Sequence, residues 1–456
     1  MTSQFPERVD VAIIGAGSVG IAVAYYLARE HGLTRAVLID CRDPMSLTSA
    51  HSGENYRNWW PHPVMTAFTD HSIDLMEQLD RETGGRLNMT RGGYALVTRR
   101  KAPQDLFDGL QRIYDPSSGQ IRFHESGQSG YRPPLRAPWA DAPGGVDVLL
   151  SQQLIRETFP SFAPDVQTVV HIRRAGSISA QQLGQAMLER LRAAGVTLLR
   201  AEVKGITPGA PFVLELAAES GARTLRADRI VNAAGPFISD IAAMLGESVP
   251  VKCVYQQKIA FPDRERAVPR DLPFTIDVDP QTLAWSAEDS ELLAGDPATR
   301  HLVEPMDGNI HCRPDGPVDG NWIKLGWAYN RTASDPHDEE PIDRQFPDTV
   351  LRGASRLQPK LAAYVGRLPR DARHYGGYYT MTQENWPLIG RMKMPGAFIA
   401  GALSGFGSMT ACAAGALTAA WVAGKPIPDY ARSLSSDRYA DPALAPSLGE
   451  GQESCL

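Results

Sequence analysis

Cysteine is scarce in this sequence, with five residues among 456. No two cysteines stand in a C-x-x-C pair, so the pattern supports neither a zinc site nor a disulfide framework. Long apolar runs are also missing, since none reaches the roughly 18 residues that suggest a membrane-spanning helix. The first ten residues, MTSQFPERVD, lack the basic and then apolar order of a secretory signal. We therefore expect a cytoplasmic protein with no bound metal and no membrane partner.

An excess of charge of one sign is absent as well. The chain has 46 Lys and Arg against 52 Asp and Glu, a net charge of -6, and both signs are scattered along it. Because no basic stripe is present, nucleic acid is not an expected partner. Hydrophobic residues at 43% and charged residues at 21% are ordinary for a globular protein. The length favours two domains over one core, and it leaves a homo-oligomer open.

The first 40 residues carry a strand, a glycine-rich turn, a helix and a second strand. The apolar run VDVAII (9–14) precedes the turn GAGSVG (15–20). A helical pattern follows the turn, and AVLID (36–40) then reads as the second strand. A G-x-G-x-x-G turn between a strand and a helix is typical of dinucleotide-binding proteins, and the turn alone does not distinguish NAD from FAD.

Each residue of this turn has a physical role in such a site. Gly15 permits the tight turn, Gly17 lets a pyrophosphate approach the backbone, and Gly20 allows close packing of helix and strand. The helix N-terminus offers free N–H groups to the anion. Asp40 ends the second strand, where a carboxylate can bind ribose hydroxyls. The candidate binding residues of this unit are Gly15, Gly17, Ser18, Val19, Gly20, Asp40, Cys41 and Arg42.

Two kinds of segment make up the rest of the chain. Helix and strand patterns like those of the first unit recur, whereas other stretches hold much of the proline, short isolated strands and few helices. We interpret the first kind as a nucleotide-binding domain and the second as a substrate domain inserted into it. The first would comprise residues 1–94, 166–250 and 371–432, the second residues 95–165 and 251–370, and a polar, poorly ordered tail residues 433–456.

Four separated blocks resemble a known family. They are DVAIIGAGSVGIAVAYYLA with VLID, AGSISAQQLGQAMLERLRAAGVTLL, IVNAAGPFIS, and TQENWPLIGR followed by AFIAGALSGFGSM. Together they resemble the FAD-dependent amine and amino acid oxidases, which include D-amino acid oxidase, glycine oxidase and monomeric sarcosine oxidase. The resemblance implies FAD as cofactor. It also implies an α/β fold, with a Rossmann-like FAD-binding domain and an inserted α+β substrate domain on a mainly antiparallel sheet.

The resemblance also places further residues beside the cofactor. The turn at 401–408 would direct backbone N–H groups at the flavin, and a helix N-terminus favours the negative charge of reduced flavin. Sarcosine oxidase-like members commonly have a lysine after this turn, where this chain has Met409. The additional cofactor-binding residues expected are Val203, Ala233, Ala234, Gly235, Gly401, Gly405, Phe406, Gly407, Ser408 and Met409.

Lys324 lies in the apolar stretch NWIKLGWAYN (321–330). Burying an ammonium group is unfavourable by several kcal/mol unless a partner compensates. The stretch resembles a family strand whose lysine lies beside the flavin and promotes reduction of dioxygen, because a fixed cation stabilises the developing superoxide. The alternative is a lysine whose stem packs in the sheet while its head pairs with a carboxylate. Where the family has an active-site histidine, this chain has Ala328.

Three more residues are candidates for contact with the substrate. Arg57 can hold a carboxylate with its forked guanidinium group, or it can form a surface ion pair. His311 can hydrogen-bond the substrate, or it can be a core histidine. Tyr379 can line the pocket or pack in a strand.

The loop after Asp40 corresponds to one that the family wraps around the flavin ring. The small residues Ser49 and Ser52 permit close approach to the cofactor. His51 in the same loop would pack against the flavin or, as related dimethylglycine and sarcosine dehydrogenases do, attach it covalently. The Trp–His pair of those dehydrogenases is Ala50–His51 here.

The expected function is oxidation of the C–N bond of an amino acid or N-substituted amino acid. A small-molecule amine would give a hydride to flavin, and dioxygen would reoxidise the flavin to yield hydrogen peroxide. One alternative is a dehydrogenase of the same fold that passes electrons to a quinone or a carrier protein. Another is a flavin-binding subunit of a larger complex. NAD-linked hydride transfer is less well supported, because only one clear dinucleotide motif is present.

Overall fold

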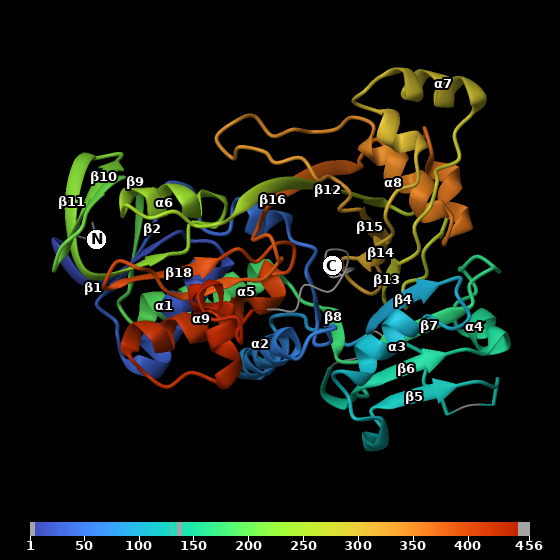
Figure 1. Ribbon diagram of the computed structural model, residues 1–456, viewed down its shortest axis with the longest axis horizontal. Coiled ribbons are helices and arrows are strands. Elements are labelled where there is room, and N and C mark those ends of the chain that lie inside the picture. Colours follow the sequence, from blue (N-terminus) through green and yellow to red (C-terminus); the bar gives the residue numbers. More distant parts are fainter. Residues whose placement is uncertain (1–4, 129, 135–138, 446–456) are drawn as a thin grey trace.

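The computed structural model describes residues 5–128, 130–134 and 139–445. Two sheets dominate it, and Figure 1 shows the first sheet with its helices on the left and the far edge of the second at the lower right. No helix within these described ranges is both long enough and apolar enough to cross a membrane.

The first sheet has seven strands, most of them parallel. β1 pairs in parallel with β2 and β11, β2 pairs with β9, and β11 pairs with β18. β10 bridges β9 and β11 in antiparallel fashion, and β17 lies antiparallel to β18. The strands are β1 (Arg8–Ile14), β2 (Ala36–Asp40), β9 (Thr197–Thr207), β10 (Phe212–Ala218), β11 (Gly221–Asn232), β17 (Leu388–Arg391) and β18 (Ala397–Gly401).

Helices α1 (Ser18–His31), α5 (Ala180–Ala193) and α9 (Gly407–Ala423) pack beside this sheet (Figure 1). α1 begins at Ser18, within the glycine turn, and ends before Gly32, whose left-handed backbone (φ 64°) closes the helix. α1 and α9 approach closely, because a Cβ atom at Gly415 would lie only 2.6 Å from the Cβ of Ala22. The pairing of α1 with the C-terminal helix places the glycine turn at 15–20 near the turn that precedes α9.

The second sheet has nine strands and is mainly antiparallel. Its order is β16-β12-β15-β14-β13-β4-β7-β6-β5, with parallel pairing only for β13–β4 and β5–β6. The strands are β4 (Tyr94–Thr98), β5 (Ile121–His124), β6 (Val146–Leu149), β7 (Thr168–Ile172), β12 (Lys252–Pro262), β13 (Phe274–Asp277), β14 (Ile310–Asp315), β15 (Trp322–Gly326) and β16 (Arg373–Met381). The two sheets confirm the fold class expected from the sequence.

Two strands belong to the second sheet although the sequence analysis assigned their residues to the nucleotide-binding segments. β7 pairs with β4 and β6, and β16 pairs with β12. Pairing partners far apart in sequence decide where such strands lie, and the local pattern of β-type residues does not reveal them. The segment boundaries given above therefore stay a prediction.

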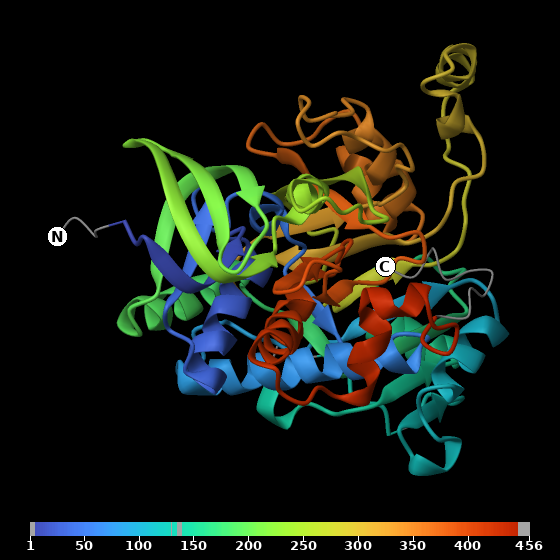
Figure 2. The same cartoon turned by 60° about the vertical axis from the view of Figure 1, so that its left-hand side comes forward.

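The remaining helices are α2 (Pro63–Glu82), α3 (Gln104–Gln111), α4 (Gln152–Thr158), α6 (Ile238–Met244), α7 (Ala287–Gly295) and α8 (Phe346–Ser355). Of these, α6 packs on the first sheet, α2 packs against α9, and the other four belong to the cores of the second sheet. Figure 2 shows α7 standing away from the body at the end of two long segments. A short ladder of β3 (Asn55–Arg57) with β8 (Ala175–Ser177) holds the loop that follows β2.

The expectation of a poorly ordered tail is wrong for its first part. Leu434 is fully buried, and Arg438 is 3% exposed in a short 3₁₀ helix, Ser436–Tyr439. The guanidinium group of Arg438 lies 2.6 Å from the carboxylate of Glu384 and donates to the carbonyl of Pro387. These bonds satisfy the polar guanidinium group and attach the first part of the tail to the fold, although its polar composition suggested disorder. Residues 446–456, with Cys455, lie outside the described residues.

Candidate cofactor and active site

The glycine turn after β1 is crowded by backbone atoms. Gly15 has φ 111°, and a Cβ atom there would lie 2.2 Å from the carbonyl oxygen of Ala233. A Cβ atom at Gly20 would lie 1.9 Å from the carbonyl oxygen of Gly15. Both distances are far inside van der Waals contact, so these positions require glycine. The turn therefore presents bare backbone, as an approaching pyrophosphate needs.

The carboxylate of Asp40, at the end of β2, forms a hydrogen bond with the backbone of the glycine turn. The backbone N–H of Ala16 donates to Asp40 Oδ2 at 2.7 Å, and that of Arg42 donates to Oδ1 at 2.8 Å. A carboxylate has about four lone-pair positions, so two bonds leave room for others. Asp40 thus has a structural task that the sequence analysis did not foresee, and binding of ribose by its remaining lone pairs stays a prediction.

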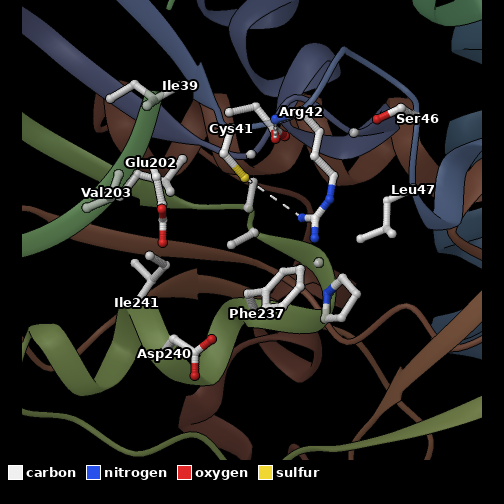
Figure 3. A pocket seen from close by; sticks show the side chains of 18 of the residues that line it. Ile39, Cys41, Arg42, Ser46, Leu47, Glu202, Val203, Phe237, Asp240 and Ile241 are labelled. Atoms are coloured by element: carbon white, nitrogen blue, oxygen red, sulfur yellow. Dashed lines mark hydrogen bonds between the residues drawn. The ribbon is translucent and has the colours of Figure 1, made fainter. Parts of the chain in front are cut away.

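A cavity of about 460 Å³ begins at this turn. Figure 3 shows its lining, with the side chains of Cys41, Arg42 and Phe237 labelled. The guanidinium carbon of Arg42 lies 5.1 Å from the centre of the Phe237 ring. The expected cofactor residues found in its wall are Gly15, Gly17, Asp40, Cys41, Arg42, Ser49, Val203, Ala233, Ala234 and Gly235.

A smaller cavity of about 100 Å³ shares part of this wall, including Gly17, Ser49 and Gly235. Of the expected residues, it adds Ser18, Val19, Gly401 and Gly407. Three hydroxyl groups in this region, Thr48 Oγ1, Tyr378 Oη and Ser404 Oγ, are buried without a hydrogen-bond partner among the described residues. Buried hydroxyls normally have a partner, so three together indicate that a polar ligand belongs here.

A third cavity, of about 80 Å³, lies where the turn before α9 meets the second sheet. Three of the four expected catalytic residues, Arg57, His311 and Tyr379, lie in its wall. The expected cofactor residues Ser52, Gly405, Phe406, Ser408 and Met409 also line it. Residues from four separate parts of the chain, 52–57, 311, 379 and 405–409, thus converge at one small site.

A stack of flat groups forms one side of this third cavity. The guanidinium carbon of Arg57 lies 4.4 Å from the ring centre of Trp60 and 5.6 Å from that of Tyr94. The Tyr94 ring stacks on Phe274 at 4.3 Å, and Phe274 stacks on His311 at 5.2 Å. Arg57 is only 2% exposed. The stack fixes a cation and an imidazole in an apolar wall from which water is largely excluded.

His311 is held in its neutral form. Burial lowers its pKa to about 3, and the nearby cations of Lys258, Arg313 and Lys324 lower the pKa further in the same direction. The imidazole can therefore donate or accept a hydrogen bond at neutral pH without carrying a charge.

Lys324 is the expected catalytic residue that does not appear in the lining of the three cavities formed by described residues. Its ammonium nitrogen lies 3.6 Å from Asp315 Oδ1 and 3.8 Å from Glu54 Oε2. Burial and the neighbouring Arg313 lower the pKa of Lys324 to about 8, although both carboxylates oppose that shift. The two acids compensate the buried charge, which is the alternative left open above. A role with dioxygen stays a prediction.

Two expected cofactor residues also lie outside the cavity walls. Gly20 packs against Gly15 inside the turn. His51 is half-buried, with its ring 5.5 Å from that of Tyr375. Contact of His51 with the flavin, covalent or not, stays a prediction.

Comparison with known proteins settles the family. Residues 10–421 match the family described as DAO, FAD dependent oxidoreductase. The chain belongs to this family. This FAD-dependent oxidoreductase is 24% identical to mitochondrial dimethylglycine dehydrogenase of Rattus norvegicus over 282 residues, which cover 60% of the chain and 29% of the relative. The match therefore spans less than a third of that relative's length.

Solved structures confirm the fold of the oxidoreductase. L-proline dehydrogenase from P. horikoshii superposes with a TM-score of 0.72 at 18% identity, covering 96% of this chain and 99% of that one. Glycine oxidase from Geobacillus kaustophilus superposes with a TM-score of 0.69 at 18% identity, covering 97% and 100%. The family and the fold expected from the sequence are both confirmed.

The residues of this oxidoreductase fit FAD. The long cavity begins at the bare backbone of the glycine turn, where a pyrophosphate can approach, and Asp40 lies in its wall. The adjoining cavity offers the unpartnered hydroxyls of Thr48, Tyr378 and Ser404 to a polar ring system. These residues would hold FAD, which supplies the two-electron redox chemistry.

Sequence reasoning missed several residues of the active site. Glu54, Tyr94, Lys258 and Phe274 line the third cavity, and Asp315 compensates Lys324. One signal was present for Lys258, because it stands as a single charge in the apolar stretch VYQQKIAFP, as Lys324 does in its own stretch. The carboxylates gave no such signal, since acids are common in loops and at strand ends.

Proposed function

We propose that this oxidoreductase oxidises the C–N bond of an amino acid or N-substituted amino acid. The observation that carries the proposal is the buried Arg57 in the wall of the third cavity, stacked between Trp60 and Tyr94. A buried guanidinium group beside a small cavity suits a carboxylate, which it can bind through two parallel hydrogen bonds. The names of the similar proteins, which refer to dimethylglycine, L-proline and glycine, support a small amino acid as substrate.

The chain's own residues would perform binding and orientation. Arg57 would bind the substrate carboxylate and so place the amine-bearing carbon toward the turn before α9. The rings of Trp60, Tyr94 and Phe274 would exclude water from the reacting carbon. Neutral His311 would hydrogen-bond the substrate without repelling a developing positive charge on nitrogen. FAD held by the residues of the two adjoining cavities would supply the two-electron oxidation, and water would hydrolyse the resulting imine to a carbonyl compound and an amine or ammonia.

Dioxygen is the proposed electron acceptor, with hydrogen peroxide as the product. The supporting observation is the buried cation of Lys324, which is largely protonated at neutral pH because its pKa is about 8. A fixed positive charge favours electron transfer to dioxygen, since the first product is an anion. A second candidate is a dehydrogenase with a quinone or carrier protein as acceptor. The two carboxylates near Lys324 favour that candidate, because they already offset part of its charge.

Anaerobic mixing tests the substrate class directly. The purified yellow protein is mixed with a panel of amino acids and N-methyl amino acids, and the visible absorption of the flavin is followed. Bleaching by at least one of them is expected, and bleaching by none would overturn the proposal. Admitting air then distinguishes the acceptors, since an oxidase regains its colour quickly and a dehydrogenase needs an artificial acceptor. Complete turnover by the isolated chain would exclude a mere flavin-binding subunit.

A further inference from the structure

Lys258 is a second buried cation in the wall of the third cavity. It lies on β12 and is only 4% exposed. Its strand neighbour on β15 is Gly326, where a Cβ atom would lie 3.1 Å from Lys258 Cγ and 2.4 Å from His311 Nε2. The glycine thus leaves the space that the stem of Lys258 and the ring of His311 occupy. The side chain of Lys258 is therefore a buried part of the cavity wall and does not reach the cavity from the protein surface.

The charge of Lys258 is not offset by an acid in the described part of the chain. Among the described residues, no carboxylate lies within ion-pair distance of its ammonium group, and its recorded partner is the face of the Tyr379 ring at 5.4 Å. A ring face compensates a buried cation only in part. Lys324, two strand positions away on β15, has two carboxylates nearby. The contrast shows that Lys258 lacks a partner that the fold supplies to an equally buried lysine.

The two acids in the cavity wall are already engaged elsewhere. Asp307 lies 2.9 Å from the guanidinium group of Arg331 at the exposed rim. Glu54 faces Arg313 and Lys324 and accepts a hydrogen bond from the backbone of Ala180. The interior of the cavity therefore has a positive excess, and this excess contributes to the low pKa of His311. A buried cation without a counter-charge in a ligand cavity is a position for an anionic group of the ligand.

We propose that Lys258 forms a second carboxylate-binding subsite, and that the preferred substrate is an amine bearing two carboxylates. Arg57 on β3 binds the first carboxylate, and Lys258 on β12 binds the second. The substrate class is then an acidic amino acid or an N-carboxymethyl amino acid. The inference rests on the proposed oxidation of an amino acid and adds to it the identity of the second substituent. The competing arrangement has both cations on one carboxylate.

Sarcosine and iminodiacetate form a matched pair of probes. Both are secondary amines of glycine, and they differ in that a methyl group of the first is a carboxymethyl group in the second. With the FAD-loaded enzyme under anaerobic conditions, we expect iminodiacetate to bind about tenfold more tightly than sarcosine, as judged from the concentration dependence of flavin bleaching. Lys258→Met should abolish this preference by weakening the binding of iminodiacetate far more than that of sarcosine. Lys258→Arg should retain it.

A surface variant and a ligand-binding measurement complete the test. Lys360→Met removes the same charge from an exposed position and should change neither affinity. Retention of FAD and of the thermal midpoint shows whether Lys258→Met is folded, and Lys258→Gln replaces it if it is not. Malonate and acetate, added as non-reacting ligands, should perturb the flavin spectrum with a preference for malonate that Lys258→Met removes.

The possible failures are distinguishable. If Lys258→Met weakens sarcosine and iminodiacetate equally, both cations hold one carboxylate and the second subsite is wrong, while the proposed function stands. If wild-type enzyme prefers sarcosine, the dicarboxylate class is wrong. If no amine bleaches the flavin, the proposed function fails, and the malonate preference still supports or refutes the subsite by itself.

Discussion

The ammonium nitrogen of Lys324 lies 3.6 Å from the carboxylate of Asp315, across the pairing of β15 with β14. The same carboxylate lies 2.7 Å from the guanidinium group of Arg313. One acid on a neighbouring strand therefore serves two buried cations, and Glu54 adds a second negative charge from the loop before β3. This arrangement permits a lysine in an apolar strand while holding its pKa near 8.

Replacing this lysine tests its role with dioxygen. In Lys324→Met, substrate should still bleach the flavin at nearly the wild-type rate, because the lysine lies outside the cavity lined by Arg57 and His311. If Lys324 has the proposed role with dioxygen, reoxidation by air should slow by about tenfold or more, because the cation proposed to stabilise the developing superoxide is gone. Stopped-flow absorbance measures the two half-reactions separately.

The matched control for that experiment is Lys360→Met, an exposed lysine far from the charged cluster in sequence. It should leave both half-reactions unchanged. An unaltered reoxidation rate in Lys324→Met would show that the lysine is only a structural partner of Asp315 and Glu54. The dehydrogenase alternative would then be the better description.

The glycine turn makes a prediction about cofactor retention. Gly20→Ala places a Cβ atom where the carbonyl oxygen of Gly15 lies, so the turn must open. Overpacking of this kind is unfavourable by about 1–3 kcal/mol, which corresponds to FAD binding weaker by about fivefold to about 150-fold. Gly295→Ala, at the end of α7, should retain FAD fully, because no heavy atom of the described residues lies within 4 Å of the added Cβ. Equal flavin content in the two purified variants would contradict the assignment of the turn.

Thr48 distinguishes a cofactor contact from a packing role. Its hydroxyl is buried and has no partner among the described residues. In Thr48→Val the shape is kept and the unpaired oxygen is lost, so the FAD-free protein should be as stable as wild type or more so. FAD binding should weaken by about fivefold, the value of one hydrogen bond. A variant that loses stability without FAD but binds the cofactor normally would assign Thr48 to the fold alone.

The sequence predicted those parts of the site that depend on short local patterns of residues. Gly15, Gly20 and Asp40 belong to one strand–turn–helix–strand unit, whose chemistry depends on spacing within 26 residues, 15 to 40. The turn at 401–408 is similarly local. Such patterns can be recognised without knowing how the strands pair, because each residue acts on neighbours in the same unit.

The parts that the sequence did not predict depend on pairing between distant strands. Lys258 reaches the cavity because β12 pairs with β15, and Asp315 reaches Lys324 because β14 does. The partners of these residues lie roughly ten to seventy positions away, so nothing in their own neighbourhood reports the contact. Conversely, the sequence pattern predicts only a ribose contact for Asp40, whereas in the structure its carboxylate accepts hydrogen bonds from Ala16 in the glycine turn and from Arg42 just after β2.

The half-buried His311 gives the last prediction, on stability and pH. Its pKa falls from 6.5 to about 3 on folding, so between these values the unfolded chain binds a proton that the folded protein does not. Stability is therefore complete above about pH 6.5 and is lost as the pH falls below it. Between pH 7 and pH 5 this one group should lower the free energy of unfolding by about 2 kcal/mol. His311→Gln should remove that part of the pH dependence, measured by urea denaturation at both pH values.

His171, whose pKa burial also lowers to about 3, should contribute a similar and separate part that His311→Gln leaves intact. Identical pH dependence in wild type and His311→Gln would mean that the histidine is already solvated or protonated in the folded protein, and its role as a neutral hydrogen-bonding group would be wrong.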